Sequence, residues 1–433
     1  MAIDVSSSTT AATPTTHQFL DELQWRGQLH QCSDLKRLGT HLNTGRRRAY
    51  IGLDPTADSL TIGNLVVLML LGRFAQAGHD PIVLAGGGTG LIGDPGGKDA
   101  ERPLLPIEQI AANVESQRRI YDALLPDATV MNNADWLTTL SYVAVLRDVG
   151  KHFSVNEMIK RDSIRNRLEG DGISYTEFSY MLLQAYDFHH LHARHGVTLQ
   201  MGGSDQWGNI VSGVDLIRRN GGGEAYALTT PLLTKADGGK FGKSESGAIW
   251  LTADRTSPYA FHQFWMNADD ADIPRYLRTF TFKTAAEITE LERESVANPG
   301  ARVAQRALAD EVTTMLHGQQ ACERANSAAK ALFTGDVTTL DAQTLSEVFA
   351  DVASARFDAT ALADDGMDLV EILVTGQLAK SNREAREFLQ NNSITVNGQP
   401  VGPGRRLTND DLLHGTTVLL RRGKKQWLVT AWA

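Results

Sequence analysis

The stretch 235–244 carries residues that could act on phosphate groups. It reads Lys-Ala-Asp-Gly-Gly-Lys-Phe-Gly-Lys-Ser and places Lys240 and Lys243 on a glycine-rich segment. Lysines on such a segment can meet negative charge that builds on phosphate oxygens in a transition state, which favours rate over ground-state binding. The segment therefore suggests phosphate chemistry, although many lysine-rich loops are simply solvated.

A polar stripe on a predicted helix suggests a binding pocket. Tyr180, Gln184 and Asp187 are spaced i, i+4 and i+7 within the stretch 174–188, so they share one helix face. Apolar neighbours such as Met181 favour burial over a solvated face. Because each buried polar group needs a partner, we expect this face to line a pocket for a polar ligand.

A predicted strand before the first long helix offers a second group of ligand-binding residues. Along strand 48–53 and just beyond it, Tyr50, Gly52 and Asp54 share one face. Gly52 removes a side chain where a flat ligand could lie close to the backbone.

The helix that follows begins with small polar residues. Thr61, Gly63 and Asn64 stand at its start, where free N–H groups and the helix dipole suit an anion. The alternative is an ordinary strand–turn–helix corner, with Thr56 in the turn and Asn64 as a helix cap.

Two glycine-containing stretches follow other predicted strands. Residues 88–93 match G-x-G-x-x-G, but Asp94 puts a carboxylate where a dinucleotide fingerprint needs a pyrophosphate, so we discount a dinucleotide site. Gly202 and Gly203 permit close approach of a ligand. The alternative for this stretch is a Gly-Ser-Asp turn with Asp205 as a helix cap.

These residues lie on an alternation of predicted strands and helices. Buried strands are expected at 48–53, 81–85, 197–201 and 226–233, and helices between them at 63–78 and 106–125. This alternation predicts an α/β fold with a parallel sheet. Amphipathic helices are expected at 285–296, 303–316 and 321–332. Beyond Asp368 we expect two short helices, β-like pieces at 393–396 and 416–420, and a hairpin-type turn at Asn397-Gly398.

Composition limits the class of protein. The 433 residues are 42% hydrophobic and 21% charged, which predicts a globular chain of about two or three domains. The net charge of -9 argues on average against nucleic-acid binding, because phosphate contacts need Lys and Arg. From Asp368 onward, however, nine Lys or Arg face six Asp or Glu, so this part carries a basic balance.

The remaining features have ordinary interpretations. Cys32 and Cys322 are too few for a disulfide framework or a zinc set, and a reducing cytoplasm fits them best. Four histidines at helical spacing lack a supporting cysteine or carboxylate pair, so we expect no metal site at His189, His190, His192 and His195. No apolar run approaches the roughly 20 residues of a membrane span.

The motifs together resemble the class I aminoacyl-tRNA synthetases, and most closely the bacterial tyrosyl-tRNA synthetase family. Thr-Ile-Gly-Asn at 61–64 is similar to the first class I signature, H-I-G-H or H-I-G-N. Lys-Phe-Gly-Lys-Ser at 240–244 is similar to the second, K-M-S-K-S. Gly-Leu-Ile-Gly-Asp-Pro and the stretches 174–188 and 200–209 also resemble tyrosyl-family strings, and the likeness runs from about residue 20 to the end.

The resemblance implies a role for each matching residue. Those expected to act in catalysis, mainly on the leaving pyrophosphate, are Thr56, Thr61, Asn64, Lys98, Arg102, Lys240, Lys243 and Ser244. Those expected to bind tyrosine are Tyr50, Asp54, Asp94, Tyr180, Gln184, Asp187, Gln200 and Gln206. Those expected to bind ATP are Gly52, Gly63, Gly202, Gly203, Asp205 and Lys243.

Within the tyrosine set, the resemblance separates two tasks. Asp94, Tyr180 and Gln184 are expected to hold the ammonium group, and Tyr50 and Asp187 to hydrogen-bond the phenol hydroxyl. A site built to bind a hydroxyl leaves buried polar groups unpaired when phenylalanine enters; the tyrosyl enzyme is the standard example, with discrimination of about 10⁵.

Thr61 departs from the family pattern, which has histidine there. Thr61 keeps a hydroxyl donor but has no ring, a shorter reach and no positive charge. The departure leaves two interpretations beside a fully active enzyme, namely slower amino-acid activation and a non-catalytic or weakly catalytic RNA-binding paralogue. A tryptophanyl-tRNA synthetase is a further alternative, but that enzyme would lack the Tyr50 and Asp187 pair.

The C-terminal part resembles the S4 RNA-binding module. Basic residues expected to bind RNA, with a solvated charged surface as the alternative, are Lys380, Arg383, Arg386, Arg405 and Arg406. The implied architecture is α/β: a disordered tail (1–16), a Rossmann-like parallel-sheet catalytic domain with a dimer-forming insertion (17–247), an all-helical anticodon-arm-binding domain (248–345), a linker (346–365) and a small α+β S4-like domain (366–433).

The resemblance also implies the reaction and its partners. The expected activity joins L-tyrosine to tRNA(Tyr) with ATP as substrate, Mg²⁺ assisting through the ATP phosphates, and no resident metal. We expect a cytoplasmic homodimer that does not bind membranes.

Overall fold

The computed structural model describes residues 18–96, 104–170, 172–239, 241–244, 247–350, 352–423 and 426–433. Residue contacts divide the chain into two compact units, one of residues 1–256 with 265–316 and one of residues 257–264 with 317–433. The predicted tail, Lys98, Arg102 and Lys240 lie outside the described residues. No helix in the described ranges is long and apolar enough to cross a membrane.

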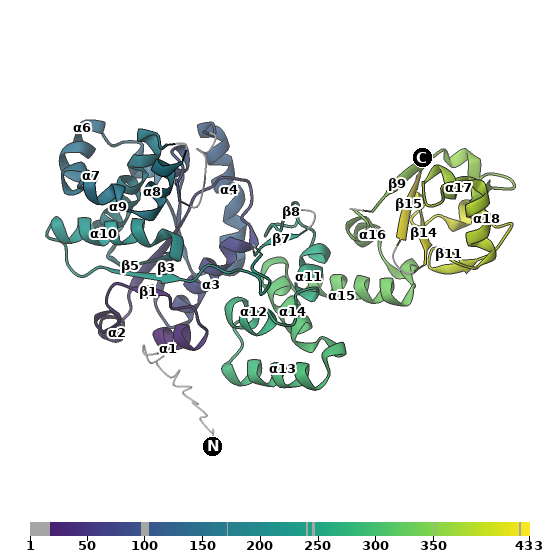
Figure 1. The fold of residues 1–433 in the computed structure, drawn as a ribbon, viewed down its shortest axis with the longest axis horizontal. Coiled ribbons are helices and arrows are strands. Elements are labelled where there is room, and N and C mark those ends of the chain that lie inside the picture. The colour runs from purple at the N-terminus through teal and green to yellow at the C-terminus, as the bar shows by residue number, and fades with distance from the viewer. Residues whose placement is uncertain are drawn as a thin grey trace, which may run out of the picture. The chain divides into compact units, whose positions relative to one another are not determined.

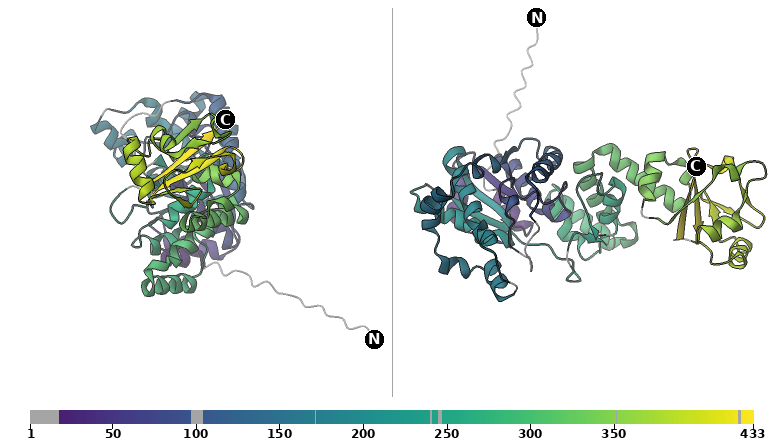
Figure 2. Two further views of the ribbon diagram at one scale, coloured as in Figure 1. Left: turned by 90° about the vertical axis from the view of Figure 1, so that its right-hand side faces the viewer. Right: turned by 90° about the horizontal axis from the view of Figure 1, so that it is seen from above.

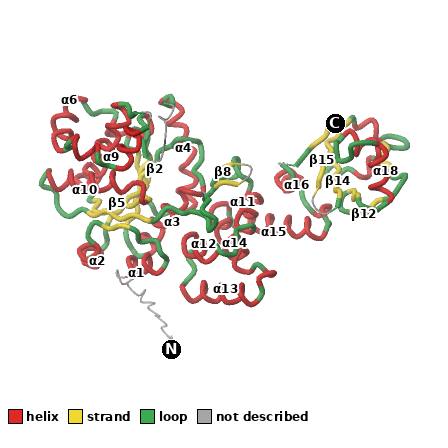
Figure 3. The backbone as a smooth tube through the Cα atoms, viewed as in Figure 1, coloured by secondary structure: helices red, strands yellow, loops and turns green. Residues whose placement is uncertain are grey.

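A six-stranded sheet forms the centre of the first unit, with helices on both sides (Figures 1, 2 and 3). Its strands are β1 (Gln31–Cys32), β2 (Arg48–Leu53), β3 (Asp80–Ala85), β4 (Thr129–Asn132), β5 (Val197–Gly203) and β6 (Tyr226–Thr230). Their order is β1-β6-β5-β2-β3-β4, and all neighbours are parallel except β1 with β6. The prediction of a parallel sheet is therefore confirmed for five strands, and the short antiparallel edge strand was not predicted.

The strand order creates a switch point between β2 and β5. The chain leaves β2 toward β3 and leaves β5 toward β6, in opposite directions. Right-handed crossovers then place the connecting helices α3 (Ile62–Gln76) and α10 (Trp207–Arg219) on opposite faces. Ligands of open α/β sheets bind at the carboxyl ends of the strands beside such a point.

The first unit contains further helices, whose positions agree with their capping residues and hydrophobic periodicity. They are α1 (Gln18–Trp25), α2 (Leu35–Asn43), α4 (Ile107–Leu124), α5 (Ala134–Leu137), α6 (Tyr142–Ala144), α7 (Val155–Ile159), α8 (Asp162–Glu169), α9 (Tyr175–His195), α12 (Ile273–Phe280), α13 (Ala285–Ala297) and α14 (Val303–His317). Helix α9, which carries the polar stripe, begins where the Ser174 side chain accepts a bond from the Glu177 N–H, and ends at Gly196 with φ +64°.

Helix α11 (Pro258–Met266) contains residues of both units, and the second unit continues through α15 (Gln319–Thr334) and α16 (Ala342–Val348). It ends in a five-stranded sheet of order β12-β11-β14-β15-β9, covered by α17 (Leu369–Thr375) and α18 (Asn382–Gln390). The strands are β9 (Ser354–Phe357), β11 (Ile394–Val396), β12 (Gln399–Val401), β14 (Thr417–Arg422) and β15 (Gln426–Trp432), with a separate pair β10 (Met367–Asp368) and β13 (Arg406–Leu407). The predicted hairpin turn is present, with φ of +48° at Asn397 and +85° at Gly398.

The stretch 346–365, which we expected to be a linker, is part of this fold. Strand β9 lies within it and pairs in parallel with β15. The pattern missed β9 because the strand is short, none of its four residues is fully buried, and its partner lies some 75 positions away along the chain. Likewise, the helical stretch 248–345 is not one compact unit, since α12 to α14 and α15 to α16 fall on different sides of the division.

Candidate active site

Asp187 lies at the inner end of a pocket beside the switch point. It is 1% exposed and accepts hydrogen bonds from Trp136 Nε1 at 2.7 Å and Asn133 Nδ2 at 2.8 Å. Burial raises the pKa of Asp187 to about 7, although these two donors lower it. A buried carboxylate that already binds two donors is well placed to accept a further bond from a ligand hydroxyl.

The Tyr50 hydroxyl lies in the same pocket. Tyr50 is 1% exposed, its ring packs edge-on against Phe188, and no described residue hydrogen-bonds its oxygen. Burial raises the pKa of Tyr50 well above its usual value, so the phenol stays protonated and remains a donor. An unpartnered buried hydroxyl is costly, which points to a ligand as its partner.

Helix α9 and strand β2 meet through a chain of hydrogen bonds. Tyr180 donates to Asp54 Oδ2 at 2.9 Å, and Thr89 donates to Asp54 Oδ1 at 2.7 Å. Asn133 in turn donates to the Thr89 hydroxyl at 2.9 Å, so it joins Asp54 to Asp187. This network fixes the wall of the pocket, and it shows Tyr180 bonded to Asp54 rather than to Asp94.

The predicted amide and carboxylate residues meet at the outer end of the pocket. Gln206 Nε2 donates to Asp94 Oδ2 at 2.7 Å, and Gln184 Nε2 donates to Gln206 Oε1 at 3.3 Å. Gln184 Oε1 and Gln200 Oε1 are buried and accept no bond from any described residue. Open acceptors beside a carboxylate suit a cationic group such as an ammonium.

Two adjoining pockets contain these residues. The inner one, of about 30 Å³, is lined by Tyr50, Asp187, Asn133, Thr89 and Gln200 among others. The outer one, of about 770 Å³, opens from it, because Asp54, Tyr180, Gln184 and Gln206 line both. The inner volume is about that of one water molecule, so an aromatic ligand must move its walls.

The outer pocket gathers most of the residues assigned to ATP. Its lining includes Gly52, Thr56, Thr61, Gly63, Asn64, Asp94, Gly202, Gly203 and Asp205. A Cβ on Gly203 would lie 2.5 Å from Asp205 Oδ1, so only glycine lets that carboxylate lie against the strand end. The pocket thus joins the start of α3 to the carboxyl ends of β2 and β5.

Thr61 and Asn64 form one hydrogen-bonded pair at the start of α3. The Thr61 N–H and hydroxyl both donate to Asn64 Oδ1, each at 3.0 Å. Two donors on one oxygen orient the amide, which leaves the Asn64 NH₂ as the donor that the pair can offer to a ligand. This pair stands at the positive end of a 15-residue helix.

Three side chains of the site escaped the sequence reasoning. Asn133 and Trp136 bind Asp187, and Thr89 binds Asp54. Asn133 follows β4 directly, so a polar residue at the carboxyl end of a strand was the available signal. Nothing local marks Trp136, which the sequence presents as one apolar residue in a short helix.

The histidine cluster lies behind this site. His190 stacks on Trp136 with ring centroids 4.4 Å apart, and His192 Nδ1 lies 2.8 Å from the Val197 carbonyl oxygen. These contacts support α9 and the Trp136 indole, which in turn holds Asp187.

In the second unit, the five predicted RNA-binding residues differ in their contacts. Lys380, Arg383 and Arg386 are exposed; the two arginines lie on α18, whereas Lys380 precedes that helix. Arg405 pairs with Asp411, and Arg406 donates to the Asp365 and Gly366 carbonyls. The first three therefore have side chains more open to an external anion.

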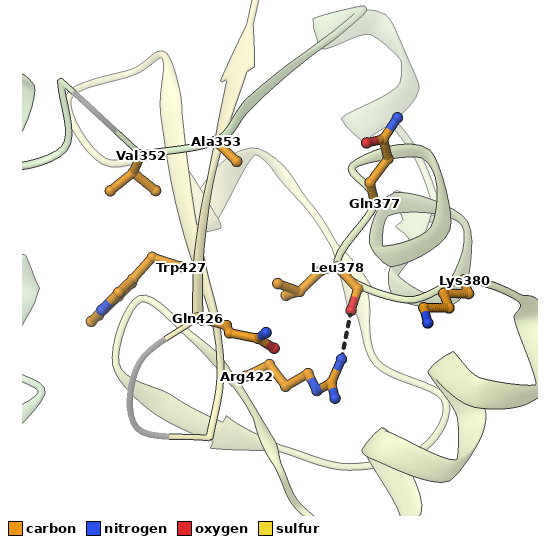
Figure 4. A pocket seen from close by; sticks show the side chains of 8 residues that line it. All are labelled: Val352, Ala353, Gln377, Leu378, Lys380, Arg422, Gln426 and Trp427. Carbon is orange, nitrogen blue, oxygen red and sulfur yellow. Dashed lines mark hydrogen bonds between the residues drawn. The ribbon is translucent and has the colours of Figure 1, made fainter. Parts of the chain in front are cut away.

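A pocket of about 460 Å³ lies beside Lys380 (Figure 4). Arg422, Gln426 and Leu378 lie on one side of β15, and Trp427 lies on the other. Arg422 is held in place, since it lies 4.0 Å over the Phe388 ring and donates to the Leu378 carbonyl at 3.3 Å. Trp427 packs against Phe349, and the Arg421 guanidinium lies over its ring.

The pKa of Asp187 predicts a pH-dependent stability. Because the folded state raises this pKa from 3.8 to about 7, it binds the proton more tightly than the unfolded state does. The stabilisation that comes from protonated Asp187 is therefore fully present below pH 3.8 and is lost as the pH rises to about 7. Relative to Asp187→Asn, we expect the free energy of unfolding to drop by about 3 kcal/mol between pH 5 and pH 8. Urea denaturation of both proteins at the two pH values measures this; parallel pH profiles would contradict it.

Comparisons with known proteins extend over nearly all of the chain. A family model described as tRNA synthetases class I (W and Y) matches residues 42–334. A second, for the Tyrosine--tRNA ligase SYY-like C-terminal domain, matches residues 344–430.

Curated relatives agree with both models. The chain is 52% identical over 416 residues to a tyrosine–tRNA ligase of Roseiflexus castenholzii, covering 94% of this chain and 98% of that protein. It is 48% identical over 424 residues to a tyrosine–tRNA ligase of Bacillus caldotenax, covering 96% and 99%.

Solved structures are similar in fold. A C-terminally truncated mitochondrial tyrosyl-tRNA synthetase of Aspergillus nidulans matches with a TM-score of 0.67 and 31% identity, over 73% of this chain and 94% of that chain. A tyrosyl-tRNA synthetase of Archaeoglobus fulgidus matches with a TM-score of 0.55 at 18% identity, over 71% and 99%, which supports the fold alone.

Proposed function

The chain belongs to the tyrosine–tRNA ligase family of class I tRNA synthetases, and we propose that its two adjoining pockets divide the work of tyrosine activation between them. The inner pocket selects the tyrosine side chain, and the outer pocket holds the reacting carboxylate and ATP. The carboxylate oxygen of tyrosine attacks the α-phosphorus of ATP, and the bond to pyrophosphate breaks. A hydroxyl of the 3'-terminal ribose of tRNA(Tyr) then attacks the carbonyl carbon, and AMP leaves.

The observation that carries the choice of tyrosine is the buried pair at the inner end. Asp187 accepts a hydrogen bond from the phenol hydroxyl of the substrate. Tyr50, whose hydroxyl has no other partner among the described residues, donates a hydrogen bond to the phenol oxygen. Phenylalanine would leave both groups unsatisfied, and the indole of tryptophan offers an N–H but no acceptor for Tyr50.

The substrate ammonium group takes the acceptors at the outer end of the inner pocket. Asp94 supplies the charge, Gln184 Oε1 supplies an open buried acceptor, and Gln206 bridges the two. The Tyr180 hydroxyl can bond the ammonium group only if its hydrogen bond to Asp54 breaks. In this conformation Tyr180 therefore stabilises the pocket wall.

The outer pocket contributes position and charge stabilisation rather than a covalent intermediate. Asp205 accepts from the ribose hydroxyls, while Gly52, Gly63, Gly202 and Gly203 let the nucleotide approach the backbone. Asn64 and the α3 N-terminus face the triphosphate. Lys243 and Ser244 are assigned to it from the second signature. Lys98, Arg102 and Lys240 are assigned to it from the motif alone.

Magnesium belongs to the substrate as MgATP. The carboxylates that line the outer pocket are Asp54, Asp94 and Asp205. Asp54 and Asp94 already accept hydrogen bonds from Tyr180, Thr89 and Gln206, so they do not form an oxygen cage for an ion. The proposed ligands of the ion are therefore the phosphate oxygens of ATP and not side chains of this chain.

ATP–pyrophosphate exchange tests this function. Labelled pyrophosphate should enter ATP when tyrosine is present and far less when phenylalanine or tryptophan replaces it. Equal exchange with all three amino acids would refute the choice of tyrosine. No exchange while tRNA(Tyr) still binds would show a non-catalytic RNA-binding paralogue instead.

Thr61 leads to a separate prediction. The variant Thr61→His restores the usual imidazole and adds reach and charge near the leaving pyrophosphate. We expect kcat of exchange to rise by roughly tenfold, which is less than the contribution of about 10² to 10⁴ that one positioned acid or base can make, because Thr61 already offers a hydroxyl donor. KM for tyrosine should be nearly unchanged. No gain would mean that the Thr61–Asn64 pair already supplies the donor.

A homodimer is proposed from the segment between β4 and α9. Large apolar side chains there are exposed, among them Tyr142 at 62%, Val143 at 70%, Val155 at 56% and Tyr175 at 60%. Such a surface on a chain otherwise ordinary in composition marks an association site. Sedimentation analysis should give the mass of two chains, and Val143→Asp should shift it toward one. We also propose a cytoplasmic location, which cell fractionation checks.

The second unit is proposed to bind tRNA through Lys380, Arg383 and Arg386, with Arg422 as a fixed cation beside them. We expect Lys380→Ala with Arg383→Ala to raise KM for tRNA about tenfold, because two phosphate contacts are lost. Exchange without tRNA should not change. Lys330→Ala, an exposed lysine on α15, is the matched control. Equal KM values for the double variant and the control would rule out this face.

A further inference from the structure

Phe241, in the lysine-rich loop, lies in a cluster of three aromatic rings. Its ring stacks on Phe280 with centroids 5.3 Å apart and planes at 19°, and lies 5.2 Å from Tyr276 and 6.2 Å from Trp265. Trp265 and Phe280 are completely buried. We call Trp265, Tyr276 and Phe280 the aromatic socket; Tyr276 and Phe280 belong to α12, and Trp265 lies in the last turn of α11.

Phe241 also lines the outer pocket that is assigned to ATP. Phe241 therefore contributes both to the wall of the outer pocket and to an apolar cluster. In sequence it stands between Lys240 and Lys243 of the second signature.

Gly242, the residue after Phe241, contacts the start of α3, where the first signature lies. Gly242 has φ +85°, and a Cβ there would lie 2.7 Å from Ile62 Cγ2 at the start of α3. The Ile249 N–H donates to the Gly242 carbonyl at 3.2 Å, and the Ile62 N–H donates to the Ile249 carbonyl at 2.9 Å. The loop is thus fixed at Phe241 and Gly242, between the socket and the helix start that carries Thr61 and Asn64.

The aromatic socket itself is tied to α3. Arg73, on α3, donates from Nη2 to the carbonyls of Arg278 and Thr279 at 3.0 Å and of Thr281 at 2.8 Å. Arg26 donates to the Arg278 and Thr281 carbonyls at 2.9 Å and 3.1 Å. These guanidinium groups satisfy the free carbonyls at the end of α12. The Arg73 bonds tie α12, which carries two residues of the socket, to α3, whose start carries the first signature.

We propose that Phe241 is a positioning residue for amino-acid activation, and that its ring in the aromatic socket sets the place of Lys243 relative to the start of α3. The proposal rests on the proposed function of the outer pocket. It follows because Lys243 is two residues from the anchored ring, and because its charge is useful only where the pyrophosphate leaves.

The two chemical steps separate this role from a structural one. Activation expels pyrophosphate and needs the lysines, whereas transfer to tRNA expels AMP and involves no triphosphate. Loss of a positioning residue should therefore slow the first step and spare the second. A general loss of packing would slow both steps and lower the melting temperature.

The test compares Phe241→Ala with Phe241→Leu in the full-length enzyme. For Phe241→Ala we expect kcat of pyrophosphate exchange to fall about tenfold to 100-fold, since a displacement of about 1 Å costs this much. KM for tyrosine and the single-turnover transfer of tyrosine from preformed adenylate to tRNA should stay within about twofold of wild type. Phe241→Leu, which still fills the socket, should recover most of the rate.

A further variant acts as a control. Phe333→Ala removes a phenyl ring that is 92% exposed and lies outside the socket, so it should leave exchange unchanged. The proposal is wrong if Phe241→Ala retains the wild-type exchange rate, or if transfer falls as much as exchange. Absence of tyrosine-dependent exchange in the wild type would instead refute the proposed function.

Discussion

Asp187→Asn is expected to lower kcat/KM for tyrosine in pyrophosphate exchange by roughly 10²- to 10³-fold, as happens when one member of a buried charged hydrogen-bonded pair is removed. Asparagine has the same shape, but its NH₂ must face either Trp136 Nε1 or Asn133 Nδ2, both of which are donors. Asn133 cannot turn over to help, because its Oδ1 accepts the Gly88 N–H at 2.7 Å. The variant therefore loses the acceptor that the substrate hydroxyl needs.

Phenylalanine distinguishes this loss from a collapse of the pocket. It makes no bond to Asp187, so its slow activation should change little in Asp187→Asn, and the preference for tyrosine should shrink by about the same factor that tyrosine loses. Tyr50→Phe should reduce the preference as well, because it removes the hydrogen bond that Tyr50 is proposed to donate to the substrate phenol oxygen. Asp215→Asn, on the exposed face of α10, is a matched control that should leave both substrates unaffected. An unchanged ratio of tyrosine to phenylalanine in Asp187→Asn would remove this residue from the specificity site.

Lys243→Ala is expected to lower kcat of pyrophosphate exchange by about 10²- to 10³-fold, the usual effect of deleting one group that stabilises transition-state charge. KM for tyrosine should remain close to wild type, because the lysine meets charge that is absent from the amino acid. Transfer of tyrosine from preformed adenylate to tRNA should also be retained.

Lys235→Ala provides the comparison, since Lys235 belongs to the same loop but lies outside the K-F-G-K-S string. The kcat of exchange should fall less in Lys235→Ala than in Lys243→Ala. A plot of log kcat against salt concentration should be similar for Lys235→Ala and wild type. Equal losses for the two variants would mean that the loop acts through its overall charge. A rise in KM for tyrosine without a fall in kcat would place Lys243 in ground-state binding instead.

Local features of the sequence were sufficient to predict much of the fold. Strand 48–53 was predicted with its observed bounds, and helix 285–296 to within one residue, because hydrophobic period and capping residues are properties of neighbouring positions. The same holds for the turn at Asn397-Gly398, whose residue types tolerate positive φ. The signature strings predicted the family for the same reason, since each is a short run of residues.

The sequence by itself therefore determined the family, the order of most of the strands and helices, and most of the polar residues that line the two pockets. Only the tertiary structure decided how those residues are paired: Tyr180 bonds to Asp54, Asn133 and Trp136 hold Asp187, and Phe241 enters the aromatic socket. It also placed β9 in the C-terminal sheet instead of a linker. Each of these contacts joins residues that are tens of positions apart. Their partners are selected by the order of strands in the sheet and by the packing of helices on it, and neither is expressed in the spacing of neighbouring residues.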